Sequence, residues 1–214
     1  MKRTRIKCCG ITRVEDALLA ARLGVDAIGL VFTPSSRRCI ALSRALEIRR
    51  ALPPLVDVVA LFMDDEPALI EAVVETLEPD WLQFHGDERE ADCRAWGKGF
   101  FKAVAMGDGA AALARLGDYP HAAALLLDGH ASGTGGGSGM AFDWNLVPRH
   151  LPQAIIVAGG LDADNVAAAI RAARPWAVDV SSGIESAPGI KDPARMIAFV
   201  DAVRRVDLEQ ARAD

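Results

Sequence analysis

Short apolar runs alternate with longer amphipathic segments along the whole chain. The runs are rich in valine, leucine, isoleucine and phenylalanine, and glycine, proline or aspartate bounds them. This pattern is typical of strands that are buried on both faces. It predicts eight strands, at Arg5–Cys9, Asp26–Phe32, Val56–Phe62, Asp80–Phe84, Phe101–Ala105, Ala122–Asp128, Ala154–Ala158 and Ala177–Ser181.

The segments between these runs repeat their apolar positions at helical spacing. Pro67 and Pro193 stand near the first turn of two segments, Ser43 and Asp162 are good capping residues, and a glycine after Leu23 ends the first segment. The pattern predicts eight helices, at Val14–Leu23, Ser43–Leu52, Pro67–Leu77, Glu88–Trp96, Asp108–Leu116, Asn145–His150, Asp162–Ala173 and Asp192–Val206.

The strict alternation of eight strands and eight helices predicts a parallel sheet covered by helices. Eight units in 214 residues fit an α/β protein with a single (β/α)8 TIM barrel, one catalytic domain over residues 1–214. The alternative is an open, doubly wound sheet. That fold would favour a G-x-G-x-x-G turn after the first strand, whereas Gly10 stands alone there.

The charge and composition of the chain limit the classes of partner that it is expected to bind. A formal net charge of -5 argues against nucleic acid, because proteins that bind it favour a basic surface. No apolar run is long enough to span a membrane, and the basic start lacks the apolar core of a signal peptide. The four cysteines have no zinc-binding spacing. We expect a cytoplasmic protein with reduced thiols, no metal, no cofactor and no membrane partner.

Two turns rich in glycine and serine follow the last two predicted strands. They are Ala158-Gly159-Gly160-Leu161 and Val180-Ser181-Ser182-Gly183. The active site of a (β/α)8 barrel lies at the carboxyl ends of its strands, and the loops after strands seven and eight often bind phosphate through backbone N–H groups. The alternative is that these are ordinary tight turns between a strand and a helix. A glycine- and serine-rich turn after each of the two expected strands favours a phosphate site.

Asp128 ends an apolar run, Ala-Ala-Ala-Leu-Leu-Leu-Asp. Partial burial at such a position is expected to raise the pKa of the carboxyl group, which suits a general acid, although a turn-capping carboxylate is the alternative. The glycine-rich segment Gly129–Gly139 follows directly. It fits either an active-site lid or a flexible linker.

The first strand ends in two adjacent cysteines, preceded by a lysine. Because side chains alternate along a strand, Lys7 and Cys9 share one face and Cys8 lies on the other. If Cys9 faces the barrel mouth, Cys8 packs against the helices as a small core residue. The charge of Lys7 is then expected to lower the pKa of the Cys9 thiol toward neutrality, as a thiolate base requires.

Two further candidates lie at the ends of other strands. Arg37-Arg38 follows the second strand. Two arginines in a loop are usually solvated, but a guanidinium that pointed into the barrel mouth would bind a substrate carboxylate. His85 follows the fourth strand and is either an acid–base group or a hydrogen-bonded structural group. The other three histidines are expected in loops or at a helix end, without a metal cluster.

Taken together and in order, the motifs resemble those of the phosphoribosylanthranilate isomerase family. The resemblance extends from the first strand to the last helix, through Lys7 to Thr12, Gly29 to Phe32 with Pro34 to Arg38, Leu82 to Asp87, Leu126 to Asp128, Gly137 to Gly139 with Phe142 to Trp144, Ala158 to Leu161 with Asn165-Val166, and Val178 to Glu185 with Pro188-Gly189 and Lys191-Asp192.

The resemblance implies an Amadori rearrangement in tryptophan biosynthesis, from N-(5-phosphoribosyl)anthranilate to 1-(2-carboxyphenylamino)-1-deoxyribulose 5-phosphate. It implies that Asp128 is the general acid that opens the ribose ring and that Cys9 is the base at sugar C2. Arg38 corresponds to the residue that pairs with the anthranilate carboxylate. We expect substrate binding by Arg38, Lys7, His85 and Asp179, and phosphate binding by Gly159, Gly160, Ser181, Ser182 and Gly183.

Two other functions remain open from the sequence. One is another phosphosugar isomerase or lyase on the same barrel, although that chemistry generally relies on two aspartates and a two-fold repeat. The other is a non-enzymatic thiol sensor or metal-binding protein built around Cys8-Cys9. The sequence is compatible with a monomer or a homodimer.

Overall fold

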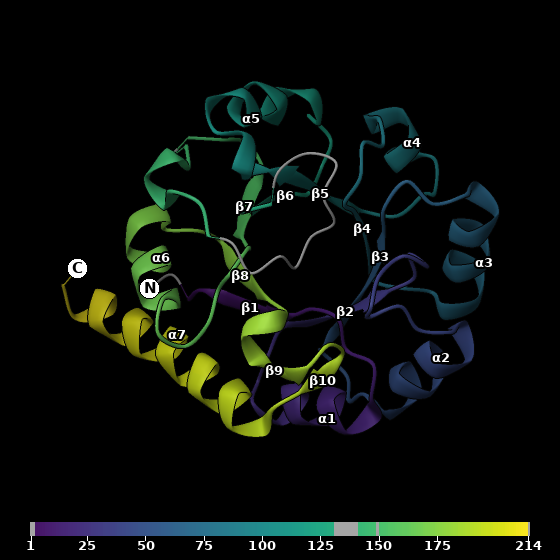
Figure 1. Cartoon of the computed structure of the whole chain (residues 1–214), viewed down its shortest axis with the longest axis horizontal. Helices are drawn as coiled ribbons and strands as arrows, with labels where there is room; N and C mark the ends of the chain where they lie inside the picture. Colours follow the sequence, from purple (N-terminus) through teal and green to yellow (C-terminus); the bar gives the residue numbers. More distant parts are fainter. Residues whose placement is uncertain (1–2, 131–140, 149, 214) are drawn as a thin grey trace.

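A computed structural model describes residues 3–130, 141–148 and 150–213 of the chain. Its eight long strands pair in sequence order and close into a parallel barrel (Figure 1). The strands are β1 (Arg5–Cys8), β2 (Ala27–Val31), β3 (Asp57–Phe62), β4 (Trp81–Phe84), β5 (Phe100–Ala105), β6 (Ala124–Asp128), β7 (Ala154–Val157) and β8 (Ala177–Val180). The barrel and the strand positions, each within two residues, are as the apolar runs predict.

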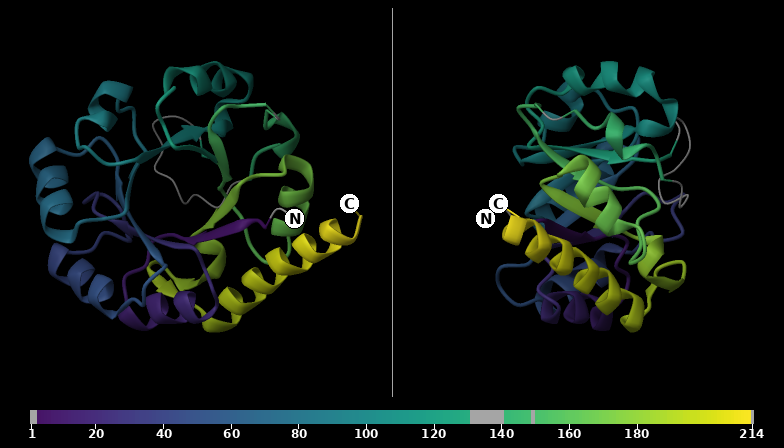
Figure 2. Two further views of the ribbon diagram at one scale, coloured as in Figure 1. Left: turned by 180° about the vertical axis from the view of Figure 1, so that it is seen from behind. Right: turned by 90° about the vertical axis from the view of Figure 1, so that its left-hand side faces the viewer.

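Helices surround the barrel, as the views from both ends show (Figures 1 and 2). The α-helices are α1 (Val14–Arg22), α2 (Leu42–Ala51), α3 (Pro67–Leu77), α4 (Glu90–Arg94), α5 (Ala110–Ala114), α6 (Val166–Ala173) and α7 (Pro193–Ala213). Short 3-10 helices add η1 (Met106–Asp108), η2 (Arg115–Asp118), η3 (Trp144–Leu146) and η4 (Ser182–Ile184). The small hairpin of β9 (Glu185–Ala187) and β10 (Ile190–Lys191) was not predicted.

The predicted helix over residues 145–150 is wrong. Of the residues described there, the first two belong to the 3-10 turn η3, and Val147 is already extended, with a ψ of 119°. Pro148 explains this, because a proline disfavours the helical conformation in the residue before it. Ser43 lies in the first turn of α2 and not at its cap position, which is Ala41.

Three other predicted helices are shorter than their patterns, and the fourth one along the chain spans only Glu90–Arg94. The segment from Asp108 is divided by Gly109, which has a positive φ of 63°, into η1 and α5. At the seventh helix, Asp162 accepts hydrogen bonds from the N–H groups of Asp164 and Asn165, so it caps a turn that precedes α6. The alternation of apolar and polar residues locates these elements, but local turn chemistry sets where each begins.

The largest apolar core lies between the barrel and its helices, and it includes Phe62, Phe84, Phe199 and Cys8. Full burial of each large apolar side chain is worth about 1.5–3 kcal/mol. A second, smaller cluster of alanine, leucine and isoleucine fills the inside of the barrel. The barrel is therefore a packed scaffold, and the space for a ligand lies at its open end.

The two ends of the described chain meet on the opposite side of the barrel from that opening (Figure 2). The backbone N–H and the hydroxyl group of Thr4 both donate hydrogen bonds to Asp207 of α7, at 2.8 and 2.7 Å. These bonds join the first strand to the last helix. Among the described helices, none has an apolar stretch that could cross a membrane.

Candidate active site

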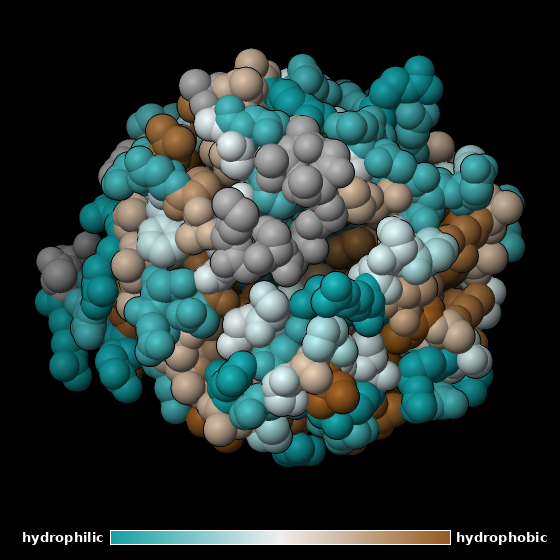
Figure 3. Space-filling view, viewed as in Figure 1, coloured by the Kyte–Doolittle hydropathy of each residue, from teal (hydrophilic) through white to brown (hydrophobic). Residues whose placement is uncertain are grey.

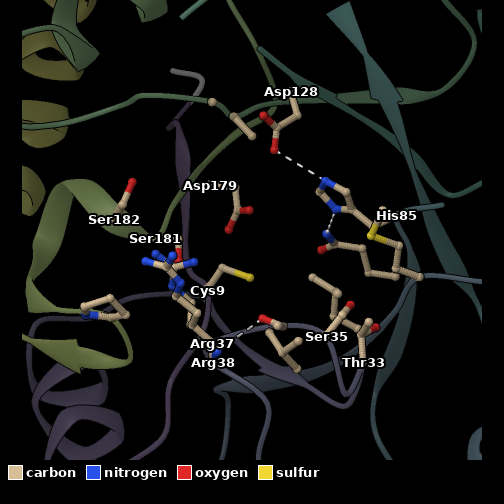
Figure 4. A pocket seen from close by; sticks show the side chains of 18 of the residues that line it. Cys9, Thr33, Ser35, Arg37, Arg38, His85, Asp128, Asp179, Ser181 and Ser182 are labelled. Atoms are coloured by element: carbon tan, nitrogen blue, oxygen red, sulfur yellow. Dashed lines mark hydrogen bonds and ion pairs between the residues drawn. The ribbon is translucent and has the colours of Figure 1, made fainter. Parts of the chain in front are cut away.

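A cavity of about 440 Å³ opens at the carboxyl ends of the strands. Figure 3 shows this end of the barrel, where hydrophilic and apolar surface is mixed. Most of the predicted site residues line the cavity, namely Cys9, Arg38, His85, Asp128, Gly159, Gly160, Asp179, Ser181 and Ser182. The side chains converge on it from β1, β4, β6 and β8 and from the loops that follow them (Figure 4).

The two adjacent cysteines lie on opposite faces of β1, as strand alternation predicts. Cys8 is 1% exposed and belongs to the large core under the helices. Cys9 belongs instead to a small cluster with Val31 and Leu61 at the cavity, and Figure 4 shows its sulfur pointing into the open space. Gly29 makes room for it, because a Cβ there would stand 2.8 Å from the Cys9 sulfur.

Lys7 lies below Cys9 and does not belong to the cavity lining. Its Nζ forms a buried ion pair with Asp179, at 2.8 Å from Oδ1, across the paired strands β1 and β8. Burial lowers the pKa of Lys7, but Asp179 and then Cys9 outweigh this effect and raise the pKa. The lysine is therefore a fixed positive charge between a carboxylate and a thiol.

The expected activation of Cys9 in the ligand-free protein is wrong. Burial raises the pKa of its thiol, and the opposing effect of Lys7 is smaller than that of burial. The negative charge of Asp179 raises this pKa further. Lys7 thus acts on Cys9 in the expected direction without reaching the expected result. The resting residue is a thiol, not a thiolate.

Replacing Lys7 by methionine is expected to lower the free energy of unfolding by about 3–5 kcal/mol, because Asp179 would be left buried without its ionic partner. Chemical denaturation at pH 7 measures this loss. The double variant Lys7→Met/Asp179→Leu is expected to recover most of it, because no charge is then left unpaired. Equal losses in the single and double variants would contradict a buried ion pair.

Asp128 ends β6 within a group of two histidines. His85 Nε2 lies 3.5 Å from one of its carboxylate oxygens, and His130 Nδ1 lies 3.2 Å from the other. The two imidazole rings stack with their centroids 4.9 Å apart. All three side chains are at most 8% exposed.

The expected raised pKa of Asp128 is also wrong. Burial does raise it, but His130 and His85 beside the carboxyl outweigh burial and hold the pKa well below its ordinary value. In the ligand-free protein Asp128 is therefore a carboxylate at neutral pH. As a general acid it would have to gain a proton from its surroundings when substrate binds.

The sequence prediction did not assign His130 to the site and expected it in a loop or at a helix end, without a metal cluster. It follows Asp128 by two positions, and its backbone N–H turns back to the Asp128 carboxylate at 3.3 Å. The backbone N–H of Gly107 also holds His130 in place by donating a hydrogen bond to its backbone carbonyl, at 2.9 Å. An Asp-Gly turn at a strand end is the signal that could have revealed this reversal.

Arg38 reaches the cavity from the loop after β2, as the prediction of an inward guanidinium requires. Its Nε and Nη2 both donate to Glu185 of β9 at 2.8 Å. Burial raises the pKa of Glu185, but Arg38 and Lys191 outweigh this and lower it. The bonds to Glu185 use one edge of the guanidinium, so Nη1 is the group that they leave for a ligand.

Glu185 and Lys191 form a supporting layer that sequence reasoning did not assign to the site, although both fall in the motifs it noted. The Nζ of Lys191 donates to the carbonyl of Cys9 at 2.6 Å and to Glu185 at 2.8 Å. It also donates to the carbonyl of Ser181. Lys191 therefore ties the ends of β1 and β8 together beneath Arg38.

The two loops that were predicted to bind phosphate lie side by side. A Cβ on Gly183 would collide with the carbonyl oxygen of Leu161, so only glycine allows this contact. Gly159 has a φ of 79°, and a Cβ there would collide with the backbone nitrogen of Gly129. Gly183 therefore supports the lining from behind, while Gly159, Gly160, Ser181 and Ser182 border the cavity. The predicted lid or linker, Gly129–Gly139, lies largely outside the described residues.

The fold and this arrangement define the class of protein: a (β/α)8-barrel with acid–base groups at the carboxyl ends of its strands. Residues 6–202 match the model of the N-(5'-phosphoribosyl)anthranilate (PRA) isomerase family. The chain is 51% identical to the N-(5'-phosphoribosyl)anthranilate isomerase of Pseudomonas paraeruginosa, over 99% of this chain and all of that one. It belongs to this family.

Solved structures of the family superpose closely on the chain. The phosphoribosyl anthranilate isomerase of Thermotoga maritima matches with a TM-score of 0.86 and 37% identity, over 94% of this chain and 99% of that one. A structure of such an isomerase in complex with reduced 1-(o-carboxyphenylamino)-1-deoxyribulose 5-phosphate matches with a TM-score of 0.83 and 35% identity, over 94% and 99% of the two chains. The predicted fold and family are both confirmed.

Proposed function

We propose that this chain catalyses the Amadori rearrangement of N-(5-phosphoribosyl)anthranilate to 1-(2-carboxyphenylamino)-1-deoxyribulose 5-phosphate, a step of tryptophan biosynthesis. Its membership of the isomerase family supports this activity. The observation that carries the proposal is the placement of a carboxyl group, Asp128, and a thiol, Cys9, in the lining of one cavity (Figure 4). A proton-shifting isomerisation needs one group to give a proton and another to remove one.

The reaction has two proton transfers, and each is assigned one residue. Asp128, carrying a proton, protonates the ring oxygen, the ring opens, and the nitrogen electrons form a protonated imine with the sugar C1. Cys9 then removes the proton from C2, which gives an enolamine, and this tautomerises to the ketone. No electron acceptor is consumed, because C1 is reduced as C2 is oxidised.

Ring opening also explains how a resting thiol could serve as a base. The protonated imine acidifies the neighbouring C2–H bond, so a weaker base suffices. Its positive charge next to Cys9 would also favour the thiolate, as a neighbouring cation does for other cysteines. Lys7 contributes in the same direction, since its charge lowers the pKa of Cys9 against the effect of burial.

The rest of the cavity fits the two ends of the substrate. Arg38 is assigned to the anthranilate carboxylate through Nη1, and Gly159, Gly160, Ser181, Ser182 and Gly183 to the phosphate. Asp179 and His85 are assigned to the sugar and amine between these ends, and Lys7 supports them from below. The proposal takes residues 1–214 as one catalytic domain, cytoplasmic, and a monomer or a homodimer.

Replacing Arg38 by alanine is expected to raise KM about 10- to 100-fold and to change kcat little, because the lost hydrogen bond to a charged carboxylate is made equally before and during the reaction. Steady-state kinetics measure both constants. Arg44→Ala is the matched control, since Arg44 pairs with Glu47 on the exposed side of α2. An unchanged KM in a folded Arg38→Ala variant would contradict this assignment.

The decisive test follows the fluorescence of the anthranilate ring after the purified protein is mixed with N-(5-phosphoribosyl)anthranilate. The signal is expected to fall with multiple turnovers, without added cofactor. No turnover by a folded protein would refute the proposal. Turnover of a different phosphosugar alone would favour the alternative isomerase or lyase. A metal-binding protein built on Cys8-Cys9 is disfavoured already, because the two thiols lie on opposite faces of β1.

A further inference from the structure

His85, Asp128 and His130 lie together at one side of the cavity, on the ends of β4 and β6. Each offers one atom that can bind a metal ion, and these atoms lie within 4.8 Å of one another. The separations between the carboxylate and the two imidazole nitrogens are 3.5 and 3.2 Å. Three ligand atoms are thus brought together, although His85 lies far from the other two residues in the sequence.

Two of these atoms face the Asp128 carboxylate without making a hydrogen bond to it. His85 Nε2 and His130 Nδ1 are both buried, and neither makes a hydrogen bond in the part of the chain that is described. His130 is 4% exposed, so its nitrogen has little access to water. A buried nitrogen that makes no hydrogen bond is costly, and it points to a ligand that would complete the group.

The spacing suits a small divalent ion. Zinc binds imidazole nitrogen and carboxylate oxygen at about 2.0–2.2 Å in tetrahedral geometry, which places neighbouring ligand atoms about 3.3 Å apart. The two imidazole–carboxylate separations, which involve different oxygens of the carboxylate, bracket this value, and all three ligand atoms lie within 4.8 Å of one another. Two imidazoles and one carboxylate with an open position toward a cavity also form a known type of zinc site.

The surroundings provide the support that a metal-bound histidine needs. Gln83 Nε2 lies 3.0 Å from His85 Nδ1, on the side of the ring away from Asp128. Half a turn of the Gln83 amide would present Oε1, which is buried without a partner, to an N–H at that nitrogen. His85 Nε2 would then be left with a lone pair for the metal, as in other metal-bound imidazoles. His130 is held by the backbone bonds to Asp128 and Gly107.

We propose that His85, Asp128 and His130 form a binding site for one divalent transition-metal ion of the zinc class. The ion binds the ligand-free protein, with the fourth position open to the cavity. Because it occupies the carboxylate assigned as general acid, it inhibits the isomerase reversibly; this consequence, unlike the binding itself, rests on the proposed function.

The test titrates chelator-treated, tag-free protein with cobalt chloride, followed by calorimetry and visible absorption. The wild-type protein is expected to bind one Co²⁺ with visible d–d bands but without a thiolate charge-transfer band. His130→Ala is expected to lose this binding. His121→Ala is the matched control and is expected to keep it, because His121 is exposed and pairs with Glu90. His130→Gln repeats the test with a side chain of similar size if the alanine variant does not fold.

Three results would overturn the site: no saturable binding by the wild-type protein, equal binding by the His130 and His121 variants, or a thiolate band that assigns the metal to a cysteine. Turnover is measured separately, first without metal and then with zinc chloride followed by a chelator. Turnover that zinc abolishes and the chelator restores supports the inhibitory site. Turnover without Co²⁺ binding refutes only the metal site, whereas Co²⁺ binding without turnover refutes only the proposed function.

Discussion

Asp128→Asn is expected to lower kcat about 10²- to 10⁴-fold and to leave KM nearly unchanged, because an amide fills the same space but cannot give a proton to the ring oxygen. The anthranilate-fluorescence assay measures both constants. The fold should be retained, since asparagine has nearly the same shape as aspartate and keeps an oxygen beside the two histidines.

Asp92→Asn is the control for this substitution. Asp92 lies on α4, where it pairs with Arg89 at the surface, so its variant is expected to keep both constants. A folded Asp128→Asn protein with kcat within about threefold of the wild type would remove Asp128 as the acid, since general acids contribute at least about 10². The proton would then have to come from another group at the cavity, and His85 is the nearest one in its lining.

The barrel could be predicted from the sequence because it rests on features that repeat. Eight apolar runs alternate with eight amphipathic segments, and only a parallel sheet covered by helices buries both. The same alternation within β1 separated Cys8 from Cys9 correctly. The prediction failed over residues 145–150, where a single proline at 148 overrides a helical pattern.

The positions of the site residues were easier to predict than their electrostatics. Strand ends place Asp128 and Cys9 in one cavity, but the pKa of each depends on partners that only the folded chain supplies. Asp128 was expected to hold a proton because it is buried, and His130 and His85 reverse that outcome. Lys7 was expected to lower the pKa of the Cys9 thiol enough to ionise it. The effect of burial on this pKa is larger than that of Lys7, and Lys7 forms its ion pair with Asp179.

The supporting residues show the same limit. Glu185 and Lys191 belong to a hairpin that no hydrophobic pattern predicts. Their side chains bond to Arg38 and to the backbone at the end of β1. Such contacts join segments more than a hundred residues apart, so spacing along the sequence carries no sign of them. The residues were visible only as part of a family motif.

The two adjacent cysteines allow a test in which the control is the neighbouring residue. Cys9→Ser is expected to lower kcat about 10²- to 10⁴-fold with little loss of stability, because a hydroxyl group is a far weaker proton acceptor than a thiolate and Cys9 borders open space. Cys8→Ser is expected to keep kcat and to lose about 1–3 kcal/mol of unfolding free energy, because a hydroxyl is buried in an apolar core.

Steady-state kinetics and chemical denaturation of both variants separate these outcomes. The pattern is opposite in the two proteins because the same change of atom affects a proton transfer on one face of β1 and core packing on the other. Burial raises the pKa of Cys8 to about 12, so its thiolate is negligible at neutral pH and cannot replace Cys9 as the base. Equal losses of kcat in the two variants would contradict the assignment of the base to one face of the strand.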